Sequence, residues 1–163
     1  MPTRAQALVP VIAAAVVVGA VGLYTAPGDA KLKSVEFPRG LIKVDGTAFQ
    51  VQVADTDARR VRGLMFQDAL PYDEGMLFVF GSPGNHGIWM SNMQFAIDVV
   101  WFSADGRAVA VSEGVQPCTT VVELVSCVTH EPGIDALYVL EATAGFVEMH
   151  GIEVGSVLEI ISA

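Results

Sequence analysis

The chain has 163 residues, with 18 aspartates and glutamates against 9 lysines and arginines, so its formal net charge is −9. A protein that binds nucleic acid needs clustered cationic side chains to displace the counterions of phosphate. This composition supplies no such cluster, and we expect no nucleic-acid partner. A chain of this length is expected to form one domain besides any targeting segment.

The first 25 residues contain an apolar run without charge, from Leu8 to Tyr24. At about 17 residues, this run reaches the lower limit for a helix that spans a bilayer. It also fits a cleaved secretory signal with Ala20-Val21-Gly22 as the cleavage site. Both alternatives place the rest of the chain outside the cytoplasm, either anchored to the membrane through this hydrophobic helix or secreted.

A linker is expected over residues 26–40, ahead of a β-rich domain over residues 41–163. Proline and glycine occur from Thr25 to Ser34 without any apolar period, which is typical of a linker. The domain then begins with a predicted hairpin. Its turn is Asp45-Gly46, since this dipeptide tolerates the positive φ angles of a two-residue turn. The two strands of the hairpin are Leu41–Val44 and Thr47–Val53.

A short helix is predicted after the hairpin, because apolar residues recur at spacings of three and four behind Asp55 or Thr56, either of which can cap the helix. These apolar residues are Ala58, Val61, Leu64 and Met65.

The remainder of the domain has the pattern of short strands separated by turn residues. Strands are predicted over Met76–Phe80, Ile88–Ser91, Phe95–Phe102, Arg107–Val115, Leu137–Ala142 and Val157–Ile161. One more helical turn is predicted at Gly145–His150. Many short strands with one or two short helices are typical of a mainly β fold, and we predict a compact antiparallel β-sandwich or barrel.

Cys118 and Cys127 are the two cysteines of the chain. In an exported domain such a pair usually forms a disulfide. A redox motif would need a C-x-x-C turn, and a zinc site would need more ligands. We therefore predict a structural disulfide that stabilises the domain by about 2.5–3 kcal/mol.

Two carboxylates interrupt apolar strands. Asp98 lies within Phe95–Phe102, a strand that is apolar on both faces and should be covered on both. Glu141 ends the apolar run that begins at Ala136. A buried carboxylate needs an ion pair, hydrogen bonds or a cavity. We expect a partner for Asp98 in Arg60, in Arg62 or in the backbone N–H groups of the turn at Trp89–Asn92. These carboxylates form either a buried network tied to Arg60, a ligand site or a catalytic acid/base pair.

Trp89 and Asn92 follow a glycine-rich loop and are candidates for a ligand platform, with core packing as the alternative for the tryptophan. His86, His130 and His150 are too dispersed along the chain to predict a metal site. No nucleotide or dinucleotide fingerprint is present, so we expect no cofactor.

Four strings between Arg60 and Phe102 resemble a known family. They are RVRGLMF, EGMLFVF, IWMSNM and FAIDVVWF. In this order they are similar to the domain-of-unknown-function family 192, a prokaryotic group without an established reaction, and the similarity runs from Val44 to Ile160. The resemblance implies a compact β-rich domain of jelly-roll-like character. The chain departs from the family pattern at Met93, Ala96 and Ser156.

Three functions are compatible with these residues. The first is a binding module for a small polar or carbohydrate-like ligand, with a groove lined by Arg60, Trp89, Asn92, Asp98 and Glu141. The second is a hydrolase that uses Asp98 and Glu141, which requires both carboxylates to face one cavity. The third is an envelope interaction or scaffold domain without a small ligand, whose partner is an envelope component.

Overall fold

The computed structural model describes residues 28–120, 123 and 126–163. The chain divides into two units, Met1–Ser34 and Val35–Ala163. The described part of the first unit is the short helix α2 (Gly28–Lys33), which lies where a linker without regular structure was predicted. The predicted N-terminal hydrophobic helix lies outside the described residues. Within the described ranges, every helix is too short or too polar to cross a bilayer.

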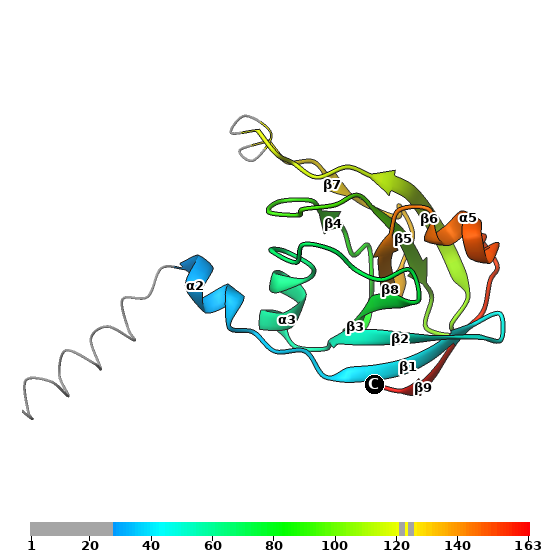
Figure 1. Cartoon of the computed structure of the whole chain (residues 1–163). Coiled ribbons are helices and arrows are strands. Elements are labelled where there is room, and N and C mark those ends of the chain that lie inside the picture. Colours follow the sequence, from blue (N-terminus) through cyan, green and yellow to red (C-terminus); the bar gives the residue numbers. More distant parts are fainter. Residues whose placement is uncertain (1–27, 121–122, 124–125) are drawn as a thin grey trace, which may run out of the picture. The chain divides into compact units, whose positions relative to one another are not determined.

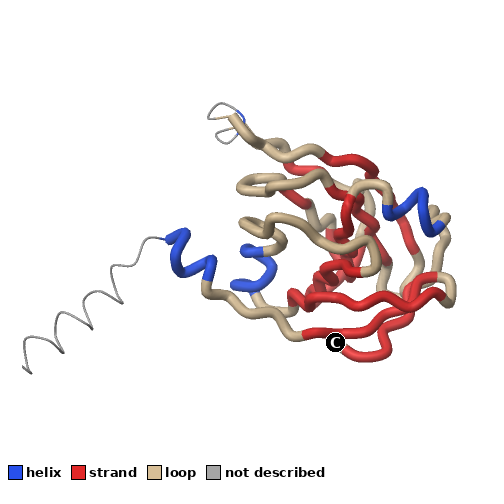
Figure 2. The backbone as a smooth tube through the Cα atoms, in the orientation of Figure 1, coloured by secondary structure: helices blue, strands red, loops and turns tan. Residues whose placement is uncertain are grey.

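The second unit is mainly β (Figure 1; Figure 2). Its strands in the large sheet are β1 (Arg39–Val44), β2 (Thr47–Ala54), β3 (Glu74–Gly84), β5 (Ile97–Phe102), β6 (Ala108–Val115), β8 (Ala136–Thr143) and β9 (Leu158–Ser162). They form a seven-stranded sheet in the order β6-β5-β8-β3-β2-β1-β9. A small sheet pairs β4 (Ile88–Trp89) with β7 (Thr129–His130). Two further short helices are α3 (Asp57–Arg62) and α5 (Phe146–His150).

The predicted β content is confirmed, but the sheet is mixed, whereas a wholly antiparallel one was predicted. Strands β2 and β3 run parallel. Two parallel neighbours must be joined by a crossover connection, and the segment that contains α3 is this crossover. The large sheet is not closed into a barrel, since β6 and β9 are its two ends. There is also no second large sheet in the described part of the chain, as a sandwich would require.

The hairpin and the first domain helix agree with the prediction. Asp45 and Gly46 both have positive φ, 49° and 83°, between the paired residues Val44 and Thr47. The side chain of Thr56 accepts a hydrogen bond from the backbone N–H of Arg59 and so caps α3. These are short-range features, which sequence patterns describe well.

Strand β5 lies at the centre of the domain. All six of its residues are buried. They alternate between two apolar clusters, with Ile97, Val99 and Trp101 in one and Val100 and Phe102 in the other. The prediction that this strand is covered on both faces is confirmed, and the two faces of the sheet have separate cores.

Candidate functional site

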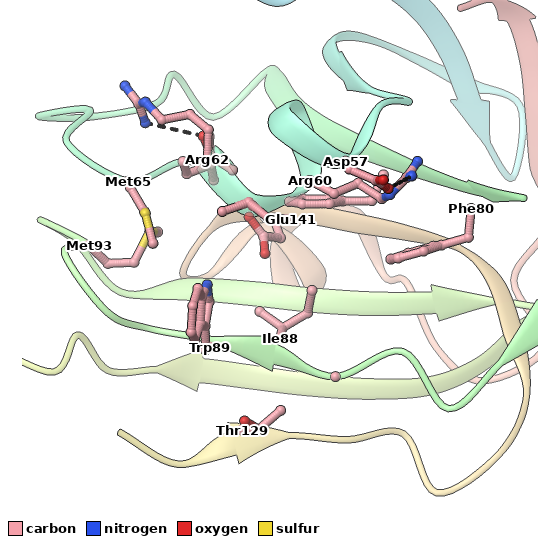
Figure 3. Close-up of a pocket in the computed structure, with 15 residues that line it drawn as sticks. Asp57, Arg60, Arg62, Met65, Phe80, Ile88, Trp89, Met93, Thr129 and Glu141 are labelled. Carbon is pink, nitrogen blue, oxygen red and sulfur yellow. Dashed lines mark hydrogen bonds and ion pairs between the residues drawn. The ribbon is translucent and has the colours of Figure 1, made fainter. Parts of the chain in front are cut away.

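A cavity of about 420 Å³ opens on one face of the large sheet (Figure 3). Helix α3 and the turn after it form one wall, β4 and β7 form the opposite wall, and β3 and β8 contribute from the sheet. The lining residues are Asp57, Arg60, Val61, Arg62, Gly63, Leu64, Met65, Phe78, Phe80, Gly87, Ile88, Trp89, Met93, Thr129 and Glu141. Most of these side chains are apolar, which is typical of small-molecule sites.

Glu141 is the acidic group of this cavity that comes from the sheet itself. On β8 it lies between Met76 of β3 and Val99 of β5, its direct partners on the two neighbouring strands. Its residue surface is 4% exposed. Among the described residues, no hydrogen bond or ion pair reaches its carboxyl group. In Figure 3 this group points into the space that Ile88 and Trp89 face from the other side.

Burial changes the protonation of Glu141. Withdrawal from water disfavours the charged form, and it raises the pKa of Glu141 from 4.5 to about 8. The group is therefore mainly a neutral carboxylic acid at pH 7. A carboxylic acid can donate one hydrogen bond as well as accept others.

Arg60 lines the cavity but does not neutralise either buried carboxylate. Its guanidinium donates to the carbonyl oxygen of Val79 at 2.8 Å and to the carboxylate of Asp57 at 2.5 Å. Asp57 itself is 97% exposed. The predicted network from Arg60 to Asp98 and Glu141 is therefore wrong, because the helix turns Arg60 toward its own first turn and the middle of β3.

Two aromatic groups lie beside Arg60. Its guanidinium carbon is 5.5 Å from the centroid of the Phe80 ring. The Phe80 ring stacks on His86, with 3.6 Å between the ring centroids. His86 in turn accepts a hydrogen bond at its carbonyl oxygen from the indole nitrogen of Trp101. This chain of contacts holds the loop before β4 in place.

Trp89 is the exposed aromatic residue of the cavity. Half of its surface is accessible, so core packing does not account for its position. It pairs with Thr129 across the small sheet, and both residues line the cavity. A half-exposed indole at a cavity wall offers a flat face to a ligand.

The predicted disulfide is present and supports this wall. Cys118 and Cys127 are bonded, with their Cα atoms 5.9 Å apart. The N–H of Cys118 donates to the carbonyl oxygen of Met90, the residue after Trp89. Cys127 precedes Thr129 by two residues. The disulfide therefore fastens the segments on both sides of the small sheet.

Asp98 has a structural set of partners. It is 1% exposed, and its carboxylate accepts hydrogen bonds from the backbone N–H groups of Gly114, Gly145 and Val147 at 2.8–2.9 Å. Two of these donors belong to the start of α5, where a carboxylate is favourable. The predicted partners Arg60, Arg62 and the backbone of Trp89–Asn92 are not among these donors, so the prediction of the partners was wrong.

Asp98 and Glu141 lie on opposite faces of the sheet. The register pairs Val99 with Glu141 and Asp98 with Ala142. Residues that pair directly point to the same face. Asp98 thus points to the cluster that contains Ala142, and Glu141 points to the cluster that contains Val99. The alternative of an acid/base pair in one cavity, which required both carboxylates on one face, is contradicted for this reason.

Asn92 is also outside the cavity lining. Its φ of 58° lies in the left-handed region, which asparagine tolerates better than most residues. Its carbonyl oxygen accepts a hydrogen bond from the N–H of Phe66. Of the five predicted ligand residues, the cavity brings together Arg60, Trp89 and Glu141.

Several lining residues were not predicted, among them Phe78, Phe80 and Arg62. The alternation in Glu74–Gly84 could have indicated the two phenylalanines, because Met76, Phe78 and Phe80 share one face of the strand. Arg62 is buried, and its guanidinium donates to the carbonyl oxygen of Gly63 and lies 5.3 Å from the Phe66 ring. Burial lowers the pKa of Arg62. Over the described residues, no cluster of histidine, cysteine or acidic side chains could hold a metal ion.

Comparisons with known proteins place the domain in a family. Residues 40–160 match the model of the domain-of-unknown-function family 192, described as "Uncharacterized ACR". No curated protein matches the chain.

Two solved structures are similar to the domain. A crystal structure of a proposed transcription regulator from Sinorhizobium meliloti 1021 has a TM-score of 0.69 and 26% sequence identity, and the alignment covers 78% of this chain and 97% of the other. A crystal structure of a protein of unknown function from Novosphingobium aromaticivorans DSM 12444 has a TM-score of 0.67 and 24% identity, and the alignment covers 78% of this chain and 95% of the other. The second likeness supports the fold alone.

Proposed function

The chain belongs to the domain-of-unknown-function family 192, and from this premise we propose that its β-rich domain is a binding module for a small ligand. The ligand occupies the cavity between α3 and the small sheet. One observation carries this proposal: Glu141 is buried and faces the cavity, and no described residue bonds to its carboxyl group. Its carboxyl group opens into a mainly apolar cavity and not onto a protein partner. Holding a carboxyl group in such a place is costly, and functional sites are where such a cost is tolerated.

The shape of the cavity supports a small ligand. Its volume of about 420 Å³ lies within the usual range for ligand sites. Trp89 offers a flat surface on which the C–H face of a sugar or the ring of a planar ligand can pack. A scaffold domain without a small ligand remains the alternative, and it would leave Glu141 unexplained.

Binding to nucleic acid is not part of the proposal. The similar structure from Sinorhizobium meliloti is that of a proposed transcription regulator, but the net charge of −9 in this chain opposes contact with phosphates.

We also propose that the domain works outside the cytoplasm, anchored or secreted through the N-terminal apolar segment. The disulfide between Cys118 and Cys127 supports this location, because disulfides persist in oxidising compartments. The partner is then a small ligand or an envelope component, and the membrane contact is made through residues 1–25.

The proposal is tested by adding a panel of neutral sugars and planar fragments to the full chain and following the indole resonance of Trp89 by NMR. We expect at least one compound to shift the resonances of Trp89 and Thr129 together. The Glu141→Leu variant should lose this response, and Glu159→Gln, a change at an exposed carboxylate on β9, should keep it. A panel that leaves both resonances unmoved would favour the scaffold alternative.

A further inference from the structure

We propose that the cavity takes a neutral small molecule, with an oxygen that accepts a hydrogen bond from the carboxylic acid of Glu141 and a flat, largely apolar body beside Trp89. The inference rests on the proposed function and adds the chemical class of the ligand. It follows from the position of Glu141, its protonation, and the charges and apolar groups around it.

The position of Glu141 leaves its carboxyl group to a ligand. Strand β8 is internal to the sheet, and Met76 and Val99 cover Glu141 on both sides. Both neighbours are fully buried and apolar, so neither can satisfy the carboxyl group. The open direction is the cavity (Figure 3). A molecule in the cavity can therefore complete the hydrogen bonding of Glu141.

The protonation of Glu141 determines what kind of partner it seeks. With a pKa of about 8, the acid form of Glu141 predominates at pH 7. The acid form donates one O–H hydrogen bond. An acceptor such as a carbonyl, amide or hydroxyl oxygen is the matching group on a ligand.

The charges around the cavity disfavour a cation. The charged lining residues are Asp57, Arg60 and Arg62, which all belong to α3. The lining residues from β3, β4 and β7 carry no charge. Asp57 is paired with Arg60. A ligand cation would therefore have to leave water for a mainly apolar cavity whose carboxylate from α3 is already paired, unless Glu141 gave up its proton.

The cavity also disfavours an anion. The guanidinium of Arg60 already donates to the carbonyl oxygen of Val79 and to Asp57, and that of Arg62 donates to the carbonyl oxygen of Gly63. An anion would have to leave water for a mainly apolar environment, which is costly without a pair. The apolar lining consists of Val61, Leu64, Met65, Phe78, Phe80, Ile88, Trp89 and Met93. It suits a neutral, flat body.

Three probes with one phenyl ring test this class directly. Acetophenone is a neutral acceptor, benzylamine a cation and benzoate an anion. Each is titrated into the full chain, with the indole resonance of Trp89 and the methyl resonances of Met65 and Met93 as readouts. We expect acetophenone to bind most tightly below pH 7, and its affinity should fall about tenfold per pH unit once Glu141 is ionised.

Variants of Glu141 separate the hydrogen bond from the proton. Glu141→Gln keeps a neutral donor of nearly the same size, so it should bind acetophenone without the fall at high pH. Glu141→Met has no donor and should lose the preference for acetophenone over the two ions. Glu159→Gln should behave as the wild type.

Two results overturn the inference, and they differ from failure of the proposed function. Benzylamine that binds more tightly than acetophenone, with an affinity that increases with pH, would show that Glu141 receives a cation as a carboxylate. Equal affinity of the three probes would show that Glu141 does not select a ligand. Titrations in which no probe moves any of the three readouts would contradict the binding module itself.

Discussion

Glu141 should make the stability of the domain depend on pH in a direction opposite to that of a paired carboxylate. Its pKa in the folded state is about 8, above its ordinary value of 4.5. The folded state therefore holds an extra proton between these values, so the free energy of unfolding falls as the pH rises from 4.5 toward 8. The gap corresponds to about 5 kcal/mol at most.

This dependence is checked by urea denaturation of wild type and Glu141→Gln. We expect similar stability of the two proteins near pH 5, where Glu141 is neutral, and a more stable variant near pH 9. Subtracting the free energy of unfolding of the variant from that of the wild type removes the contributions of the other titrating groups and leaves that of Glu141. A constant difference across this range would mean that Glu141 is not buried as an acid.

Asp98→Asn should act in the opposite direction from Glu141→Gln. The carboxylate of Asp98 accepts three backbone hydrogen bonds, one at Oδ1 and two at Oδ2. The amide of asparagine has one oxygen that can accept these hydrogen bonds. Its NH₂ group would replace the other carboxylate oxygen and would face backbone N–H groups that are also donors. We expect a loss of about 1–3 kcal/mol in the free energy of unfolding, measured at pH 7. An unchanged stability would remove the structural role given to Asp98.

Arg60→Ala should cost much less than the removal of a buried ion pair. The ion pair of Arg60 is with Asp57, which is almost fully exposed, and such pairs contribute about 0–1 kcal/mol. Loss of the hydrogen bond to Val79 adds a similar amount. Denaturation should therefore show a loss near 1–2 kcal/mol. A loss of 3–5 kcal/mol in the free energy of unfolding would instead indicate that Arg60 neutralises a buried carboxylate, as in the network with Asp98 and Glu141 considered from the sequence.

For single residues, the sequence indicated which carboxylates are buried, but it did not indicate which groups they contact. A carboxylate within an apolar strand can be recognised from the local pattern, and Asp98 and Glu141 were both found in this way. Which face each one occupies depends on the pairing of β5 with β8, and that register joins segments about forty residues apart along the chain. The single-strand pattern does not contain this information.

At the scale of elements, the small sheet and the disulfide should behave as one unit. The disulfide joins Cys118, bonded to the backbone of Met90, to Cys127, which lies beside β7. Reduction should lower the melting temperature without loss of the fold, by the equivalent of about 2.5–3 kcal/mol. Hydrogen exchange should increase in β4 and β7 before it increases in β5.

The double variant Cys118→Ser with Cys127→Ser provides the control for this experiment. It should reproduce the melting temperature of the reduced protein and should not respond to reductant. If reduction changes exchange throughout the large sheet instead, the disulfide stabilises the whole domain rather than the wall of the cavity.

The strands themselves were largely predictable, and the exceptions have physical reasons. Apolar patterns and turn residues located every strand except β7 in the described part of the chain, β4, β5 and β8 among them. Strand β7 has two residues, which is too short for any periodic signal. The parallel pairing of β2 with β3 was missed because strand patterns do not carry direction. The crossover through α3 determines that direction.

For the whole molecule, the two cysteines report on the compartment of the domain. An exported domain forms the disulfide between Cys118 and Cys127, and both thiols are then protected from alkylation until a reductant is added. We expect the full chain to be found in the membrane or extracellular fraction of an expressing cell, with no thiol labelled by a maleimide under native conditions. A variant without residues 1–25 should remain in the cytoplasm, and both thiols should be labelled, because that compartment keeps cysteines reduced. Labelling of both thiols in the full chain would mean that the N-terminal segment does not export the domain, and the cavity would then have to find its ligand inside the cell.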